Sequence, residues 1–148
     1  MKGFKLLEFE YSPGYCDMLG AGHRSELKRD GEGNWFVECR DREVHSSPTV
    51  VTRYEAAPDA VREFEKFIDK SRVASLSKRP KSDDFVTDYS PWSYYFEYEK
   101  TVLGKTVNER CGIYEYRKYS RSDFELIDEL TRRFNALRGR VLSEQTED

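Results

Sequence analysis

The chain has 148 residues, the size of one ordinary domain, and its net charge at pH 7 is only −3. Charged residues make up 36% of it with both signs interspersed, which excludes the strong field that attracts nucleic acid or an anionic membrane surface. No run approaches the roughly 18 apolar residues of a membrane span, and Glu8 and Glu10 interrupt the short apolar patch at the N-terminus. We therefore expect no nucleic-acid binding and no membrane insertion.

The three cysteines, Cys16, Cys39 and Cys111, are few and widely spaced. In a domain large enough to fold without disulfides, this pattern favours free thiols in a reducing compartment. With Met1 as the native start, the simplest placement is the cytoplasm, although a trimmed secreted or lipid-anchored precursor would have the same sequence.

The first predicted strand is KLLEFEY at residues 5–11, where Leu7, Phe9 and Tyr11 alternate with charged residues. A period of two is typical of a strand that buries one face. The sequence SPG at 12–14 ends this strand, and three of the nine glycines fall within the following GYCDMLGAGH. We expect a long glycine-rich loop there.

Residues 25–44 predict a hairpin, because GEGN in its middle supplies residues that tolerate the positive φ of a tight turn. On the return strand Trp35, Val37 and Cys39 share one face. The β-branched sequence TVVTRYEA then predicts another strand.

Two helices are predicted. The first begins at Pro58, whose fixed φ suits the first helical position, and apolar residues follow it at helical spacing. The second begins with a capping box from Ser122 to Glu125 and frays near Gly139. Its apolar residues recur every three or four positions: Phe124, Ile127, Leu130, Phe134, Leu137 and Val141. The polar residues 144–148 are expected to form a disordered tail.

Between the helices, DYSPWSYYFEYEK at residues 88–100 is unusually rich in aromatic rings. The strand period places Tyr94, Phe96 and Tyr98 on one face and Tyr95 on the other. Since only one face is aromatic, we interpret it as the buried one. A buried tyrosine needs a partner for its hydroxyl, so we expect several of these hydroxyls to lie at the sheet rim or to line a pocket.

The following strand, TVNERCGI, can be paired with the aromatic strand by matching their faces. This match places Tyr94 opposite Cys111 in the core and Tyr95 opposite Arg110 on the outer face as a cation–π pair. It also places Glu109 on the core face, where a carboxylate is costly unless it is paired or protonated. A functional role, an inward charge that protects a sheet edge and a bulge that turns Glu109 outward are the alternatives.

The order ββββ-α-ββ-α predicts an α+β fold in a single domain over residues 1–143. We expect a twisted antiparallel sheet of about five or six strands with both helices packed on one face.

Candidate catalytic residues are confined to the glycine-rich loop. Cys16 is a candidate nucleophile, with His23 as its base and Asp17 as the group that orients the histidine. The alternative is that Cys16 fills apolar space and His23 lies on the surface. The carboxylate beside Cys16 also disfavours a thiolate.

Three other motifs lack the structural context that their function would require. A zinc site built from Cys39 and His45 would have to bridge about 20 Å of strand. GAGH at 20–23 lacks the following helix of a phosphate loop. The basic residues of 132–140 accompany apolar core positions at a helix end, where basic side chains are common. We expect no metal and no cofactor.

The sequence favours a non-catalytic interaction or small-ligand-binding module whose partner is an unknown protein or small molecule. The alternative is a thiol-dependent enzyme or redox-sensitive protein that uses Cys16 and His23. Candidate ligand-binding residues come from the glycine-rich loop and the aromatic hairpin: Tyr15, Asp17, His23, Tyr95, Glu109 and Arg110.

Overall fold

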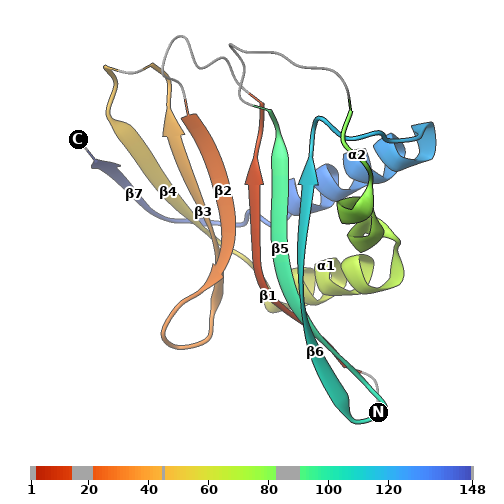
Figure 1. The fold of residues 1–148 in the computed structure, drawn as a ribbon. Coiled ribbons are helices and arrows are strands. Elements are labelled where there is room, and N and C mark those ends of the chain that lie inside the picture. Colours follow the sequence, from red (N-terminus) through yellow and green to blue (C-terminus); the bar gives the residue numbers. More distant parts are fainter. Residues whose placement is uncertain (1–2, 15–21, 45, 83–90, 148) are drawn as a thin grey trace.

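The computed structural model describes residues 3–14, 22–44, 46–82 and 91–147. These form a seven-stranded antiparallel sheet in the order β6-β5-β1-β2-β3-β4-β7 (Figure 1). The strands are β1 (Gly3–Ser12), β2 (Gly22–Arg29), β3 (Trp35–Arg42), β4 (Thr49–Glu55), β5 (Ser93–Val102), β6 (Lys105–Tyr114) and β7 (Val141–Glu147). The helices are α1 (Pro58–Lys70), the short 3-10 helix η2 (Val73–Lys78) and α2 (Arg121–Asn135).

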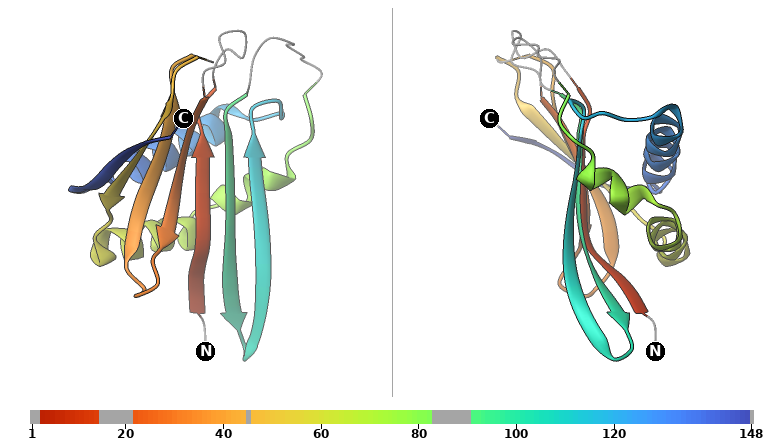
Figure 2. Two further views of the ribbon diagram at one scale, coloured as in Figure 1. Left: turned by 90° about the vertical axis from the view of Figure 1, so that its left-hand side faces the viewer. Right: turned by 45° about the vertical axis from the view of Figure 1, so that its right-hand side comes forward.

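Figure 2 shows α1 and α2 on the same side of the twisted sheet. The α+β class and the antiparallel sheet are thereby confirmed, as is the start of the first helix at Pro58. Within the described ranges, no helix is both long enough and apolar enough to span a membrane.

The sheet is larger than predicted, because the chain after α2 forms a strand. Strand β7 pairs with β4 where the sequence analysis placed a disordered tail from residue 144, so the element order ends in an additional strand. Gly139 permits this docking, since a Cβ at that position would lie 2.7 Å from the carbonyl oxygen of Glu55. The side chains of β7 are nearly all exposed, and for that reason hydrophobic periodicity did not reveal the strand.

The core lies between the helices and the sheet face that they cover, and aromatic rings fill its centre. The ring of Phe9 lies 5.4 Å from Phe96, 4.9 Å from Phe134 and 5.0 Å from Phe64, measured between centroids. Phe96 and Tyr94 are fully buried. The interpretation of the aromatic strand as core is confirmed for these two residues.

Strand β1 departs from simple alternation. Its pairing with β5 shifts register between Leu6 and Glu8, which marks a β-bulge. The extra residue changes the side chain that enters the core, so Leu6 is fully buried and Leu7 only half-buried. The alternation expected through Leu7 therefore holds only from Phe9 onward.

The predicted pairing of β5 with β6 is wrong by two residues. Tyr94 lies opposite Ile113 and not opposite Cys111, although all three face the core as expected. The turn explains the shift, because its two central residues are Leu103 and Gly104, both with positive φ (54° and 79°). Two-residue hairpin turns favour positive φ at both central residues, and glycine adopts it readily. The predicted register was based only on the matching of strand faces and did not place Gly104 at the centre of the turn.

The N-terminus of α2 also differs from the prediction by two residues. Ser120 and not Ser122 is the capping residue, and its Oγ accepts a hydrogen bond from the backbone N–H of Asp123 at 3.1 Å. In return, the Asp123 carboxylate accepts the Ser120 N–H at 3.0 Å. Asp123 is buried and paired with two arginines, which selects it over Glu125 as the carboxylate of the capping box.

Candidate functional site

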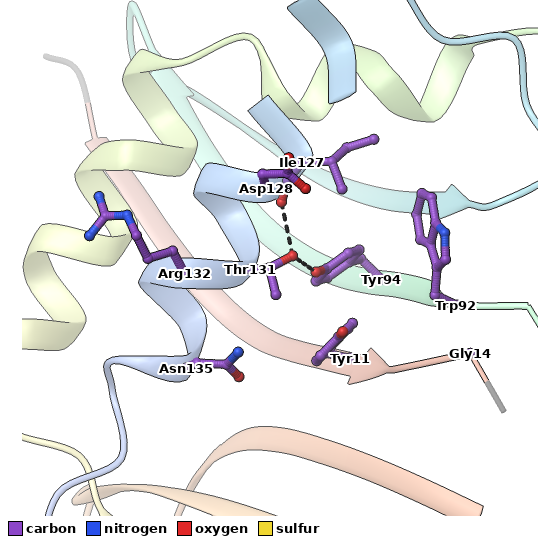
Figure 3. Close-up of a pocket in the computed structure, with 9 residues that line it drawn as sticks. All are labelled: Tyr11, Gly14, Trp92, Tyr94, Ile127, Asp128, Thr131, Arg132 and Asn135. Atoms are coloured by element: carbon purple, nitrogen blue, oxygen red, sulfur yellow. Dashed lines mark hydrogen bonds between the residues drawn. The ribbon is translucent and has the colours of Figure 1, made fainter. Parts of the chain in front are cut away.

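A pocket of about 430 Å³ opens between α2 and the neighbouring ends of β1 and β5 (Figure 3). The sheet side supplies aromatic rings, and the helix side supplies mainly polar groups. The lining residues are Tyr11, Gly14, Trp92, Tyr94, Ile127, Asp128, Thr131, Arg132 and Asn135.

The aromatic wall is a set of rings that hold one another in place. Tyr11 and Tyr94 are opposite each other on β1 and β5, and their rings stack at 4.5 Å with planes 12° apart. Trp92 lies edge-on to Tyr94 at 6.1 Å and stacks on Tyr119 at 6.2 Å. Tyr94 is fully buried, whereas Tyr11 and Trp92 are half-buried, so these two offer the accessible ring surface.

The hydroxyl of Tyr94 is tied to the helix. Thr131 Oγ1 donates a hydrogen bond to the carbonyl oxygen of Ile127 at 2.9 Å, and the Tyr94 hydroxyl therefore donates to Thr131 Oγ1. Burial raises the pKa of Tyr94, and the negative charge of Asp128 contributes in the same direction, so the phenol stays neutral at physiological pH. This chain of hydrogen bonds fixes the floor of the pocket.

The polar wall consists of side chains on one face of α2. Asp128, Thr131 and Asn135 follow one another at spacings of three and four residues. Arg132 also lines the pocket, but its guanidinium binds Glu129 through two contacts, Nη2 to Oε1 at 2.5 Å and Nε to Oε2 at 3.0 Å. Within the described part of the chain, the Asp128 carboxylate forms no ion pair.

The lining combines ring surface with a few polar groups, among them the Asp128 carboxylate and the Thr131 hydroxyl. Partly exposed rings and a few convergent polar groups are typical of a site that orients a small molecule.

His23, the predicted catalytic base, lies on β2 and faces Asp41 across the β2–β3 pair. Its Nδ1 is 2.9 Å from Asp41 Oδ1, and both side chains are partly exposed. The other loop candidates, Tyr15, Cys16 and Asp17, lie outside the described residues. The predicted Cys16–His23 pair stays a prediction.

His23 also lines a second hollow, on another part of the sheet, together with three arginines. Carboxylates lie beside these cations: Arg24 Nε is 3.3 Å from Glu10, and Arg40 Nη1 is 3.0 Å from Glu147. Because a ligand would have to compete with these carboxylates, the hollow is the weaker candidate for a binding site.

The remaining predicted ligand residues lie on β5 and β6, separated from β2 by β1. The predicted cation–π pair is absent, since Arg110 lies opposite Glu97, with Nε 3.6 Å from its carboxylate, and not opposite Tyr95. Glu109 lies opposite Tyr98 on the sheet face of Cys111, as expected, but it is exposed, so its carboxylate does not enter the core. The described members of the predicted ligand set therefore do not gather in one place, and none lines the pocket beside α2.

Two thiols can be placed. Cys39 and Cys111 are buried free cysteines, and Cys39 Sγ accepts a hydrogen bond from Ser25 Oγ at 3.3 Å. Burial raises the pKa of Cys111, which keeps its thiol protonated and unreactive. His45, the second half of the weighed zinc motif, lies outside the described residues.

Sequence reasoning anticipated part of this pocket. The expectation that tyrosine hydroxyls line a pocket is confirmed for Tyr94, but the helix side was missed. Asp128, Thr131 and Asn135 recur at helical spacing beside the apolar stripe, and this was the signal available in the sequence. Recognising it required knowing that α2 lies across the aromatic strand.

Comparison with known proteins gives no relative on which to base an assignment: no family model, no curated protein and no solved structure matches this chain.

Proposed function

We propose that this protein is a small-ligand-binding module and that its ligand occupies the pocket between α2 and the ends of β1 and β5. The observation that carries the proposal is that partly exposed rings and convergent polar side chains line one pocket, over the Tyr94 hydroxyl that is bonded to Thr131. The volume of about 430 Å³ falls within the range of roughly 300–1,000 Å³ that is usual for small-molecule sites.

The rigidity of the aromatic wall supports this function. Tyr11 is held by its stack on Tyr94, and Trp92 is held between Tyr94 and Tyr119. Side chains that are already fixed lose little conformational entropy when a ligand arrives, so more of the contact energy contributes to affinity.

The test is a fragment screen followed by amide and indole NMR spectra of the labelled protein. We expect fragments whose binding shifts the Trp92 indole N–H and the amides around Thr131. The variant Asn135→Phe should abolish these shifts, because Asn135 is exposed at the pocket wall and a ring there fills the space. The matched control is Glu125→Phe, an exposed position of the same helix outside the lining.

Shifts that survive in Asn135→Phe, or a screen in which no fragment perturbs the pocket, would overturn the proposal. Shifts lost in Asn135→Phe but kept in Glu125→Phe would support it.

A thiol-dependent activity is the second candidate, favoured by the 2.9 Å contact between His23 and Asp41. A carboxylate in this position orients an imidazole for proton transfer. Timed alkylation with iodoacetamide, read by mass spectrometry, tests it. A Cys16 rate with a pKa below about 7 that is lost in His23→Ala would support this candidate, and a rate typical of an ordinary thiol with a pKa near 8.5 would exclude it.

A further inference from the structure

The pocket beside α2 has an electrostatic character that narrows the choice of ligand. Aromatic faces carry negative partial charge and attract cations placed over them. Tyr11 and Trp92 present such partly exposed rings, and Tyr94 closes the space behind them. The aromatic wall therefore favours a cationic group whose desolvation costs little free energy.

The charged residues of the helix wall act in the same direction. Asp128 contributes a carboxylate that forms no ion pair within the described part of the chain. The one cationic side chain among the described lining residues, Arg132, is bound in two places by Glu129. Figure 3 shows its side chain extending away from the aromatic rings. Glu129 is shared with Arg133, whose Nε lies 2.7 Å from Oε1, so Asp128 is the one charged lining residue that forms no ion pair among the described residues.

We propose that the ligand of this pocket is a small organic cation, such as an alkylated ammonium group, held against the Trp92 and Tyr11 rings and balanced by Asp128. This inference rests on the proposed function and specifies its ligand class. An anionic ligand would be repelled by the Asp128 carboxylate, and Nε and Nη2 of Arg132 already bind Glu129. A neutral apolar ligand would gain nothing from Asp128, which is exposed and charged.

The hydrogen-bonding groups fit a cation that carries one further polar substituent. The Asn135 amide lies at the pocket wall and can both donate and accept. The Tyr94 hydroxyl is already committed as a donor to Thr131. A hydroxyl or carbonyl on the ligand would therefore interact with Asn135, while the charged group interacts with the rings and Asp128.

The experiment compares choline with 3,3-dimethylbutan-1-ol, which has the same shape but a carbon in place of the charged nitrogen. Binding is measured by titration of the Trp92 indole N–H in NMR spectra and by calorimetry. We expect choline to bind at least about fivefold more tightly than the neutral analogue. Affinity for choline should fall as salt rises, because the attraction to Asp128 is screened.

Variants separate the two sources of attraction. Asp128→Asn keeps the shape and removes the charge, and it should weaken choline about fivefold while leaving the neutral analogue unchanged. Trp92→Leu should weaken choline strongly, whereas Trp92→Phe keeps an aromatic face and most of the affinity. Glu125→Gln is the matched control, since it removes one exposed carboxylate of the same helix outside the pocket.

Equal affinities for choline and its neutral analogue, or an Asp128→Asn variant that binds choline like the wild type, would overturn the cation inference. Failure of choline to bind, in a protein whose pocket still binds neutral fragments, would overturn it as well and leave the proposed function intact. A pocket that binds no fragment of any kind overturns the proposed function itself.

Discussion

The Asp123 carboxylate at the start of α2 accepts a hydrogen bond from Arg79, with Nε 2.9 Å from Oδ2. Arg72 donates to the other carboxylate oxygen at 2.7 Å, and Asp123 also caps the helix through the Ser120 N–H. Both arginines flank η2, so this buried carboxylate fixes the segment between the helices to the end of α2. Because α2 carries the polar wall of the pocket, its anchoring also positions the candidate site.

The first prediction concerns the pH dependence of stability. The hydrogen bonds from Arg79, Ser120 and Arg72 hold the pKa of Asp123 well below its ordinary value of 3.8. As the pH falls through that ordinary value, the carboxyl of Asp123 takes up a proton in the unfolded chain but not in the folded protein. The stabilisation that Asp123 gives the fold is therefore complete above pH 3.8 and is lost as the pH falls toward the lower folded-state pKa. We expect Asp123→Asn to lower the free energy of unfolding by about 2 kcal/mol at pH 7 and by less at pH 3.

Urea unfolding at several pH values measures this difference. Glu125→Gln, which removes an exposed carboxylate two residues along the same helix, should change stability by less than about 0.5 kcal/mol at every pH. A loss in Asp123→Asn that stays constant between pH 7 and pH 3 would contradict the assignment.

The second prediction tests the two faces of β5. Phe96 is fully buried against Phe9, so Phe96→Ala should lower the free energy of unfolding by about 3–5 kcal/mol. Tyr95 lies on the sheet face away from the helices and is half-buried, and Tyr95→Ala should cost less than about 1 kcal/mol. Denaturant melts of both variants provide the measurement, and equal losses would be incompatible with this assignment of faces.

The third prediction uses the turn between β5 and β6. Leu103 has a φ of 54° and an exposed fraction of 88%, so it bears the cost of a left-handed conformation and gains almost nothing from burial. Leu103→Asn should raise the free energy of unfolding by about 1 kcal/mol, since asparagine tolerates this conformation and Asn-Gly is favoured in such turns.

Gly104→Ala is the counterpart, because alanine at a φ of 79° is strained and should lower the free energy of unfolding. Thermal melts that rank Leu103→Asn at or below the wild type would show that the turn does not have this geometry.

The features that the sequence predicted are those set by local patterns. Pro58 begins a helix because its fixed φ suits that position, and Tyr94 and Phe96 enter the core because a strand places alternate residues on one face. The bulge after Leu6 depends on pairing with β5, which is distant in the sequence. Ser120 and Ser122 both begin a Ser-x-x-acid pattern, and the choice of Ser120 accompanies the long-range ion pairs of Asp123 with Arg72 and Arg79.

The candidate site was predicted only in part for the same reason. The aromatic wall follows from one strand, but the pocket exists only where α2 crosses it. No pattern near Asp128 indicates that Trp92, distant in the sequence, lines the same space. The Asp128 carboxylate would be an ordinary solvated charge on an isolated helix, and it lines a pocket only because α2 packs across the sheet.

The last prediction concerns the attachment of β7. The Gly139 N–H donates to the carbonyl oxygen of Glu55 at 2.7 Å, and the Glu55 N–H donates to the carbonyl oxygen of Arg140 at 2.8 Å. Gly139→Ala would place a Cβ against that same Glu55 oxygen and force this connection apart. Since the side chains of β7 are nearly all exposed, the strand depends on its backbone hydrogen bonds and should detach before the core unfolds.

Amide hydrogen exchange followed by NMR distinguishes this local effect from global destabilisation. In Gly139→Ala we expect exchange in β7 to accelerate about tenfold or more, with exchange in β1 and β5 changing much less. Gly31→Ala is the matched control, because a Cβ at Gly31 meets no atom within 4 Å and the residue does not have positive φ. Exchange in β7 that is equally fast in the wild type and in Gly139→Ala would mean that the strand does not depend on this glycine.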